Sequence, residues 1–534
     1  MRLLTILFLL ITTTTFSQNN PKLMVGLVVD QMRYEYIYRF WDRYENNGFK
    51  RLIEEGYNFK NAHYNYIPTY TGPGHSSIFT GTTPATHGIV SNGWYDPNTE
   101  EYRYCVSDST EQTVGEKSAE GNMSPRTQFS TTIGDELKLA SSGRGKVIAV
   151  ALKDRSAVLP AGHAADGAYW MSSHGNWISS TFYMESLPKW VKKYNSKKRT
   201  QSLLCQNWNT LFPIETYTSS LSDHNHFEGP YEGLEKAVFP YDLKTISKNG
   251  EQASLIKATP FGNQITREFA QEVVINETLG QDEITDLLTV SFSSIDYIGH
   301  QFGPHSIEME DAMLRLDQEL GAFFQFLDEI VGKGEYTVFL TADHGAVPVP
   351  SYLIDQKIPA GYVSMSNVKE KLDSLLNNEF KVEGLVKNYS NYQVYLNHEL
   401  MQQHHLDYSK AYQIAENFFM KEEGVYEVLN RRQLLDTDWT EGIKAKAQNG
   451  YHPGLSGDIW VILKPGWISY PTTGTTHGSA FSYDTHIPML WMGKNVPHGE
   501  SVKQVNITDI SPTVSNLLNI PQPNGNIGIV LPFE

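Results

Sequence analysis

The chain has 534 residues, of which 40% are hydrophobic and 12% aromatic, a composition that excludes a disordered protein and allows a large core. Its formal net charge of −17 argues against nucleic acid or an anionic membrane surface as a general partner. A small anionic substrate is still compatible, because a bound cation reverses the sign of the local field.

The first residues have the pattern of a secretory signal peptide. Arg2 precedes the apolar run LLTILFLLI, and small residues lead to a predicted cleavage site near Ser17. The apolar run is shorter than a membrane-spanning helix requires, and no later stretch is long and apolar enough to span a bilayer. We therefore expect residues 1–17 to be removed and the mature protein to be periplasmic or secreted, without a membrane span.

Cys105 and Cys205 are the two cysteines of the chain. An oxidising compartment permits a bridge between them, but two cysteines do not make a disulfide framework. The simpler expectation is two isolated thiols.

Four short apolar runs are predicted to be strands that are buried on both faces. Their Val, Leu and Ile residues do not alternate with polar ones, which is typical of parallel sheets. The runs lie within residues 23–30, 145–155, 287–296 and 336–345. Helical patterns lie between them, at 49–56 and at 306–331, where Ser306 is the predicted N-cap. This alternation predicts an α/β fold, a three-layer α/β/α sandwich with a mostly parallel central sheet.

Two stretches interrupt the alternation of strands and helices. Residues 164–260 are aromatic, polar and rich in turn residues, and they are predicted to form an inserted cap. Residues 346–465 contain strand and helix patterns of their own and are predicted to form a small α+β subdomain. The catalytic core would then consist of residues 18–345 and 466–534.

Acidic and imidazole side chains follow three of the predicted strands. Their residues are Asp30, Asp296, His300, Asp343 and His344. A lone Asp at the end of a strand is ordinarily the N-cap of the next helix, and a lone His in a polar loop is ordinarily solvated. However, the carboxyl ends of parallel strands meet at one edge of a sheet, where ligands bind. The recurrence predicts a metal site with oxygen and imidazole ligands suited to zinc, to which His477 of the loop TTGTTHGSA is a further contributor.

The stretch YTGPGHSSIFTG at residues 70–81 concentrates hydroxyl groups and glycines in one turn. A metal ion lowers the pKa of a bound hydroxyl, so a nucleophile in this turn needs no adjacent base. The stretch is not a serine-hydrolase elbow, because it lacks the second glycine of G-x-S-x-G. Spacing alone does not choose between Thr71, Ser76 and Ser77.

Lys153 and Arg155 follow another predicted strand, two residues apart. On an extended segment they would project to the same side and bind a phosphate, Arg155 through its bidentate fork, although a solvated charged loop is the ordinary interpretation. Asn92 could donate a hydrogen bond to a phosphoryl oxygen, but Asn-Gly is first of all a turn signal.

Other motifs do not support a function. HELMQQHH at 398–405 lacks the second histidine of H-E-x-x-H, so His398, His404 and His405 are expected at the surface. His224 and His226 lie in a polar segment and are expected in a solvated loop. No phosphate-binding G-x-x-x-x-G-K-[ST] and no dinucleotide fingerprint is present, so ATP-driven or NAD chemistry has no support.

Five motifs resemble, in the same order, those of the alkaline phosphatase superfamily of two-zinc hydrolases. They are VGLVVDQMR, TYTGPGHSSIFTGTTPATHGI, SSIDYIGHQFGP, TADHG and TTHG. The resemblance is closest to the phosphate-irrepressible periplasmic alkaline phosphatase branch and covers nearly the whole mature chain. It implies that Thr71 is the nucleophile. The implied ligands are Asp30, Asp343, His344 and Thr71 for one Zn²⁺, and Asp296, His300 and His477 for the other.

The same resemblance implies hydrolysis of small phosphate monoesters through a covalent phospho-threonine. Asn92, Lys153 and Arg155 match the residues that contact phosphoryl oxygens in the monoesterase branch. Related phosphodiesterases generally lack the Lys-x-Arg pair, and the C/S-x-P-x-R motif of sulfatases is missing here. A phosphodiesterase or nucleotide pyrophosphatase on the same fold, and a non-catalytic exported protein that binds phosphate or metal, are the alternatives. The sequence does not indicate an oligomeric state, and a monomer is compatible with it.

Overall fold

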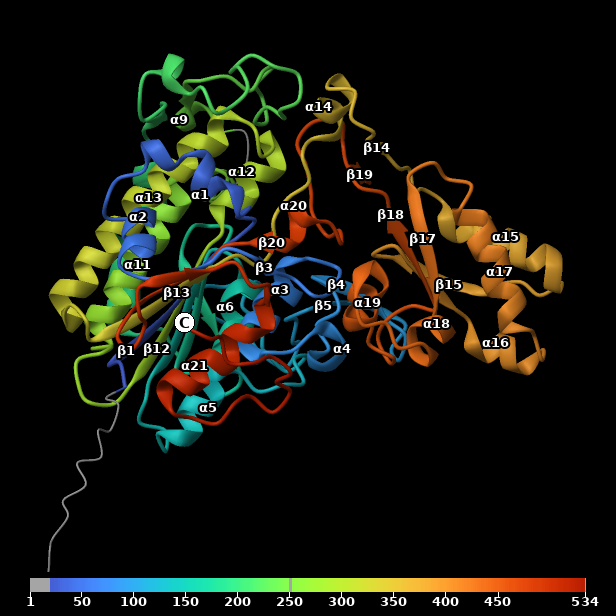
Figure 1. Ribbon diagram of the computed structural model, residues 1–534, viewed down its shortest axis with the longest axis horizontal. Coiled ribbons are helices and arrows are strands. Elements are labelled where there is room, and N and C mark those ends of the chain that lie inside the picture. Colours follow the sequence, from blue (N-terminus) through green and yellow to red (C-terminus); the bar gives the residue numbers. More distant parts are fainter. Residues whose placement is uncertain (1–19, 249–251, 534) are drawn as a thin grey trace, which may run out of the picture.

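The computed structural model describes residues 20–248 and 252–533 (Figure 1). The predicted signal peptide, residues 1–17, lies outside this part of the chain. No helix in the described part combines the length and apolar character needed to cross a membrane.

A ten-stranded sheet forms the centre of the molecule. Its five middle strands are parallel, and each of the four predicted strands is among them. In sheet order these are β13 (Tyr336–Thr341), β1 (Leu23–Val29), β12 (Asp286–Phe292), β7 (Val147–Ala151) and β8 (Gly167–Met171). On one side lie β21 (Met489–Gly493), antiparallel to β13, then β2 (Tyr57–Phe59), antiparallel to β21, and β22 (Gly499–Ser501), parallel to β2. On the other side lie β9 (Trp177–Ser180), antiparallel to β8, and β6 (Thr113–Val114), antiparallel to β9.

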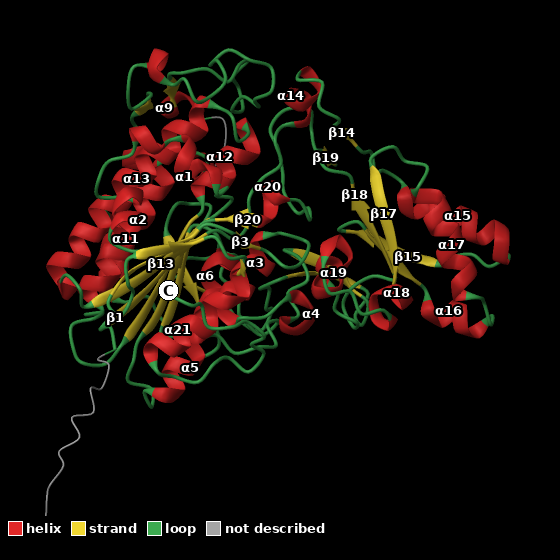
Figure 2. Ribbon diagram, viewed as in Figure 1, coloured by secondary structure: helices red, strands yellow, loops and turns green. Residues whose placement is uncertain are grey.

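Helices cover both faces of this sheet (Figure 2). One face carries α1 (Glu35–Arg39), α2 (Phe49–Glu54), α11 (Phe261–Asn276), α12 (Ser294–Phe302) and α13 (Ile307–Leu327). The other carries α3 (Thr71–Thr80), α5 (Ile133–Ala140), α6 (Asp154–Ala161) and α21 (Ile510–Leu518). Ser306 is the N-cap of α13, since its Oγ accepts the Met309 N–H at 3.1 Å. The predicted three-layer α/β sandwich and this cap are confirmed.

The register of the central strands places their carboxyl ends side by side. β1 pairs with β12 from Leu23 opposite Asp286 to Val29 opposite Phe292, and every residue of both strands is buried. Apolar side chains on both faces therefore hold the strands between the two helix layers. The residues that follow β1 and β12 consequently emerge at the same edge of the sheet.

The segment 164–260 contributes more to the core than its composition indicates. β8 and β9 belong to the central sheet, because β8 pairs with β7 and β9 pairs with β8, and their aromatic residues, including Trp170 and Trp177, are buried. The rest of the segment is irregular and holds short elements. These are α7 (Lys189–Ser196), α8 (Arg199–Leu203), β10 (Asn207–Trp208), β11 (Tyr241–Asp242), α9 (Leu243–Ile246) and α10 (Gln252–Lys257).

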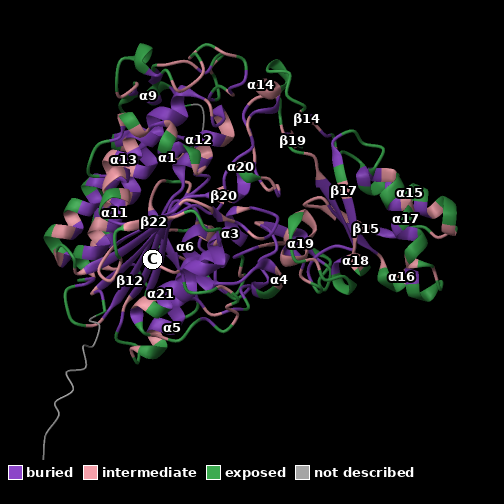
Figure 3. Cartoon of the chain, viewed as in Figure 1, coloured by how far each residue is buried: buried purple, intermediate pink, exposed green. Residues whose placement is uncertain are grey.

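Within 346–465 a second, four-stranded antiparallel sheet has a hydrophobic core of its own (Figure 3). Its strands, in sheet order, are β15 (Val386–Ser390), β16 (Gln393–Leu396), β18 (Ile459–Leu463) and β17 (Val425–Asn430). The accompanying helices are α15 (Val368–Phe380), α16 (His398–Gln403), α17 (Tyr408–Phe419), α18 (Arg431–Asp436) and α19 (Gly442–Gly450). The chain enters and leaves beside the paired strands β14 (Gly361–Tyr362) and β19 (Trp467–Ile468).

A short hairpin lies between the core and this subdomain. It consists of β4 (Gly93–Asp96) and β5 (Glu101–Tyr104), which pair antiparallel. The subdomain holds it from one side, because Asn391 Nδ2 donates to Gly93 O at 2.8 Å and Lys387 forms an ion pair with Glu100. The inserted subdomain thus contacts the loop region that contains Asn92.

Candidate metal and phosphate site

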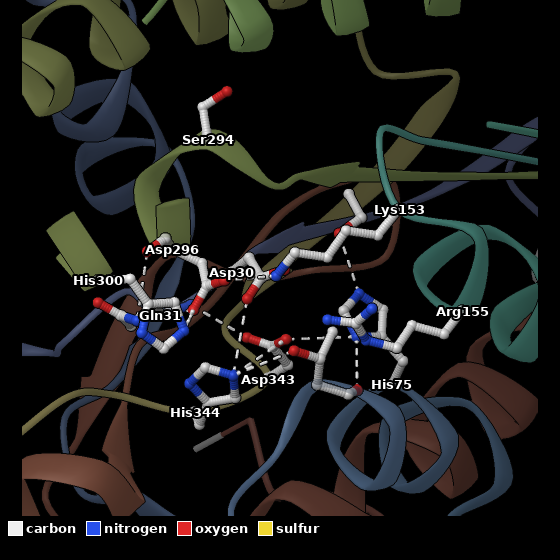
Figure 4. Close-up of polar contacts among 12 residues, drawn as sticks. Asp30, Gln31, His75, Lys153, Arg155, Ser294, Asp296, His300, Asp343 and His344 are labelled. Carbon is white, nitrogen blue, oxygen red and sulfur yellow. Dashed lines mark hydrogen bonds and ion pairs between the residues drawn. The ribbon is translucent and has the colours of Figure 1, made fainter. Parts of the chain in front are cut away.

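The six predicted acidic and imidazole ligands lie together at the carboxyl edge of the central sheet. Figure 4 shows five of them, Asp30, Asp296, His300, Asp343 and His344. Asp30 follows β1 directly, and Asp343 and His344 follow β13. Asp296 and His300 lie in α12, one turn apart, with His300 Nε2 at 3.2 Å from Asp296 Oδ1. The register of the parallel strands therefore brings these side chains together.

The first ligand group surrounds His344. Its Nε2 lies 3.6 Å from Asp30 Oδ1, 3.5 Å from Asp343 Oδ2 and 3.5 Å from Thr71 Oγ1. Asp30 Oδ1 and Asp343 Oδ2 are buried and have no hydrogen-bond partner among the described residues. Because buried carboxylate oxygens are normally partnered, their convergence on one imidazole nitrogen fits a bound cation.

The second ligand group surrounds Asp296. His300 Nε2 and His477 Nε2 lie 3.2 and 3.6 Å from Asp296 Oδ1. Ligand atoms of these three residues all lie within 4.8 Å of one another, as do those of Asp30, Asp296 and His344. Asp296 thus adjoins both groups.

Backbone carbonyls orient all three histidines. The Nδ1 atoms of His300, His344 and His477 lie 2.8, 2.9 and 2.8 Å from the carbonyl oxygens of Thr475, Gly345 and Thr69. A carbonyl only accepts, so each Nδ1 carries a proton, and Nε2 is the ring atom of each histidine that is available to bind a metal. In addition, the rings of His344 and His477 stack at 3.5 Å. This donor set fits a metal with nitrogen and oxygen ligands.

The charges of the site depend strongly on burial. Burial raises the pKa of Asp30 to about 6 and that of Asp343 well above its usual range. Burial acts in the same direction on Asp296, but the neighbouring His300 and Lys153 outweigh it and hold the pKa of Asp296 well below its usual range. Burial lowers the pKa of His477 to about 3, so this ring is neutral, the form that binds a metal.

Lys153 lies between the two ligand groups (Figure 4). Its Nζ donates to Asp30 Oδ2 at 2.5 Å and to Asp296 Oδ2 at 2.6 Å. The expectation that Lys153 and Arg155 share one side of an extended segment is wrong. Lys153 is the N-cap of α6, and Arg155 already lies in its first helical turn.

The other predicted phosphate contacts are beside the first ligand group. Asn92 Oδ1 accepts the Gly72 N–H at 2.7 Å, next to Thr71. Arg155 Nη1 donates to the Tyr104 hydroxyl at 3.1 Å, and Arg155 Nε is buried without a partner in the described part of the chain. Both side chains retain hydrogen-bond donors for a further acceptor.

The structure separates the three hydroxyl candidates of the turn. Thr71 is the first residue of α3, and its hydroxyl faces His344. Ser76 Oγ donates to Gln128 Oε1 at 2.7 Å, and Ser77 Oγ lies 3.0 Å from His87 Nε2. Both serine hydroxyls are therefore engaged away from the ligand groups.

Gly74 explains why α3 begins so close to the site. A Cβ at this position would lie 2.4 Å from the carbonyl oxygen of Asp343 and 2.8 Å from Asp343 Cβ. Only glycine permits this approach of the helix to the end of β13. Thr71, one turn earlier, is thereby held against the ligands.

Sequence reasoning missed two residues of the site. Gln31 has a φ of +65°, donates its backbone N–H to Asp343 Oδ1 at 3.1 Å, and donates from Nε2 to Asp296 Oδ1 at 2.6 Å. His75 lies with Nδ1 2.9 Å from Thr71 O and with Nε2 2.9 Å from Ser291 Oγ. His75 is the titratable residue of the TGPGHSS turn, which could have indicated that it lies near the site. In contrast, nothing in the sequence indicates the backbone conformation of Gln31.

The residues that the sequence analysis set aside lie away from this site. His224, His226, His398, His404 and His405 are exposed. Cys105 is a buried free thiol and Cys205 an exposed one, so the expectation of isolated thiols is confirmed.

A mostly parallel sheet with two Asp/His groups and a threonine at its carboxyl edge is the arrangement that the resemblance to the alkaline phosphatase superfamily implies. A sequence profile of the type I phosphodiesterase / nucleotide pyrophosphatase family matches residues 24–486, and the chain belongs to this family.

Relatives cover almost the full length of the chain. Alkaline phosphatase PhoV of Synechococcus elongatus is 46% identical over 96% of this chain and 92% of its own. A protein of Myroides odoratus named calcium-transporting ATPase is 44% identical over 95% and 93%. The crystal structure of wild-type alkaline phosphatase PafA superposes with a TM-score of 0.92 and 42% identity, covering 96% of this chain and 98% of that one. These likenesses confirm the resemblance to the alkaline phosphatase superfamily.

Proposed function

We propose that the protein is a zinc-dependent alkaline phosphatase that hydrolyses phosphate monoesters. The observation that carries the proposal is the Thr71 hydroxyl at 3.5 Å from His344 Nε2, beside unpartnered carboxylate oxygens and two cationic side chains. Its similarity to PhoV and PafA, both named alkaline phosphatases, supports the same reading.

Two Zn²⁺ ions would be held by two sets of residues. The first set is Asp30, Thr71, Asp343 and His344, and the second is Asp296, His300 and His477. When bound, the ions would lower the pKa of the Thr71 hydroxyl and compensate the negative charge on the attacking and leaving oxygens.

Thr71 is the nucleophile in this proposal. Its hydroxyl gives up a proton and attacks phosphorus in line, while the bond from phosphorus to the alcohol oxygen breaks and the alcohol takes up a proton. Water then cleaves the phospho-threonine, which restores the hydroxyl and releases inorganic phosphate. The placement of Thr71 at the start of α3 adds backbone N–H groups that favour an anion at this point.

Lys153, Arg155 and Asn92 select the monoester. A monoester carries more negative charge on its non-bridging oxygens than a diester, so cationic donors stabilise it more. Asn92 Oδ1 is already used by the Gly72 N–H, which leaves its NH₂ group to donate to a phosphoryl oxygen.

A phosphodiesterase is the second candidate, because the matching profile is named for that activity. Purified protein would be assayed with p-nitrophenyl phosphate, bis-p-nitrophenyl phosphate, p-nitrophenyl sulfate and ATP, with chelator and after zinc is restored. We expect the monoester to be hydrolysed fastest, chelator to abolish turnover, and zinc to restore it. The Thr71→Ala variant should be inactive while Thr71→Ser retains activity. Faster diester turnover, or turnover that is independent of zinc, would contradict the proposal.

We also propose that the protein is exported after cleavage near residue 17. N-terminal sequencing of protein recovered from the producing cells tests this. A mature chain that still begins with Met1 would contradict it.

A further inference from the structure

The base of the β4–β5 hairpin lies between two parts of the site. Asn92 precedes β4 and Tyr104 ends β5, and the Cys105 N–H closes the base by donating to Asn92 O at 3.0 Å. On one side Asn92 Oδ1 accepts the Gly72 N–H, and on the other Tyr104 reaches the first turn of α6. The hairpin therefore places one polar side chain on each side of the phosphate-binding region.

The Tyr104 hydroxyl has two partners with opposite roles. It donates to Asp154 Oδ1 at 2.5 Å and accepts from Arg155 Nη1 at 3.1 Å. The phenol has a single proton, and Asp154 takes it, so an oxygen lone pair faces the guanidinium. Burial, followed by the charge of Asp154, raises the pKa of Tyr104 well above its usual range, so the hydroxyl keeps its proton at alkaline pH.

Arg155 depends on this contact for its orientation. Among the described residues, the Tyr104 hydroxyl is the one hydrogen-bond partner of its guanidinium, and the buried Nε has none. Asp154 Oδ1 already accepts the backbone N–H of Arg155 at 2.6 Å. Without the phenol, this carboxylate would be left with an open acceptor next to a cationic group.

We propose that Tyr104 is a positioning residue for Arg155, which holds the guanidinium away from Asp154 and toward the phosphoryl group. This inference rests on the proposed phosphatase function. Loss of the hydroxyl lets the guanidinium turn to Asp154, so the phosphate loses a charge-assisted contact. The effect falls on the monoester, whose additional negative charge this contact stabilises.

Zinc-loaded Tyr104→Phe tests the inference. We expect kcat/KM for p-nitrophenyl phosphate to fall about tenfold, as for loss of one hydrogen bond to a charged group, with the diester changed less than about twofold. Binding of inorganic phosphate, measured by calorimetry, should weaken by a similar factor. Tyr102→Phe is the matched control, because Tyr102 lies on the same strand and is 72% exposed; it should leave all three quantities unchanged.

A double-variant comparison separates positioning from a general loss of structure. In an Arg155→Ala background, Tyr104→Phe should have no additional effect, and its thermal unfolding should match that of Arg155→Ala. The inference is overturned if Tyr104→Phe leaves phosphate binding intact, lowers mono- and diester turnover equally, or acts fully in the Arg155→Ala background. If the wild-type protein hydrolyses no monoester, the proposed function fails, and the calorimetric comparison still decides the role of Tyr104.

Discussion

Lys153 shows at the scale of one residue how the ligand groups depend on compensating charge. Its side chain is buried and its Nζ contacts both Asp30 and Asp296. Removing one partner of a buried ionic contact leaves uncompensated charge, which is more costly than the loss of a surface pair.

Lys153→Met should therefore destabilise chelator-treated protein by about 3 kcal/mol, measured by urea unfolding. Zinc should reduce the difference, because bound cations compensate the same carboxylates. Lys60→Met is the control, since the Lys60–Glu500 pair is similarly short at 2.6 Å but its side chains are 31% and 59% exposed, and its loss should cost less than about 1 kcal/mol. Equal losses in the two variants would show that Lys153 has no special part in the stability of the site.

Part of the site could be predicted because its residues lie within three positions of the end of an apolar strand. Asp30, Asp343 and His344 are such cases, and the parallel register alone brings them together. Tyr104 could not be found in this way, because it reaches Arg155 only through the packing of a hairpin against α6. The spacing of residues did not separate Thr71 from Ser76, and Thr71 was implied only by the family resemblance; the partners of the two hydroxyls now distinguish them.

At the scale of the element, α3 is set by the contact of Gly74 with the end of β13. A Cβ there would meet the backbone of Asp343 rather than a movable side chain. Gly74→Ala should cost about 1–3 kcal/mol of stability and lower kcat about 100-fold, because the start of α3 and Thr71 must shift. Urea unfolding and steady-state kinetics measure the two effects.

Gly454→Ala is the matched control for this change. The nearest atom to its added Cβ is His452 Cε1 at 3.5 Å, an ordinary contact. It should retain both stability and activity. A Gly74→Ala protein that behaves like this control would show that α3 does not need its close contact with β13.

A pair of buried glutamates connects the irregular segment to the first turn of α13. Glu228 Oε1 accepts from Asn225 at 2.7 Å and Glu308 Oε1 from Tyr241, while the second oxygen of each has no partner in the described residues. Burial raises the pKa of Glu228 to about 10 and that of Glu308 to about 8. Both groups are thus protonated in the folded protein at neutral pH.

Glu228→Gln should make the protein less sensitive to alkaline pH. An unfolded glutamate titrates near pH 4.3, so the stability contributed by the raised pKa is complete below that value and is lost as the pH rises through the folded pKa near 10. Through this carboxyl, the wild-type protein loses up to about 1.4 kcal/mol of unfolding free energy per pH unit, and the variant does not. Urea unfolding should find variant and wild type alike at pH 4 and the variant more stable at pH 9.

The exposed Glu235→Gln variant is the control for this pH series. Its difference in stability from wild type should be the same at both pH values. A Glu228→Gln variant that follows the same pattern would contradict the raised pKa.

The elements of the core could be predicted more completely than those of the insertions. Uninterrupted apolar runs identify β1, β7, β12 and β13, because a strand between two helix layers must be apolar on both faces. β8 does not stand out in the sequence, since its Tyr169 and Trp170 resemble the aromatic segment that follows. Aromatic composition does not distinguish a buried strand from an irregular loop with its own small core.

At the scale of the whole molecule, the metal content should govern stability. At a free Zn²⁺ concentration 100 times the Kd of a site, binding at that site raises the free energy of unfolding by about 2.7 kcal/mol. We therefore expect chelation to lower Tm by about 5 °C or more and zinc-loaded protein to contain two ions per chain. Scanning calorimetry and elemental analysis measure these quantities.

The surface group Glu116, Glu120 and His174 provides the control for metal counting, because its ligand atoms also lie within 4.8 Å of one another. Glu120→Gln should leave both the count and Tm unchanged. A fall in the count with this variant would place an ion outside the proposed site. An unchanged Tm on chelation of the wild-type protein would contradict the link between metal and folding.

His344 and His477 stack ring against ring at 3.5 Å, although the proposed function assigns them to different Zn²⁺ ions. If one imidazole ring turned when its ion left, it would displace the other ring that stacks on it. Conversely, an ion that fixes one ring would also hold the other ring in position to bind the second ion. Filling would therefore be cooperative, with one sigmoidal isotherm for both ions instead of two separate steps. When zinc is scarce, most molecules would therefore hold either no zinc or two Zn²⁺ ions, and few would hold one.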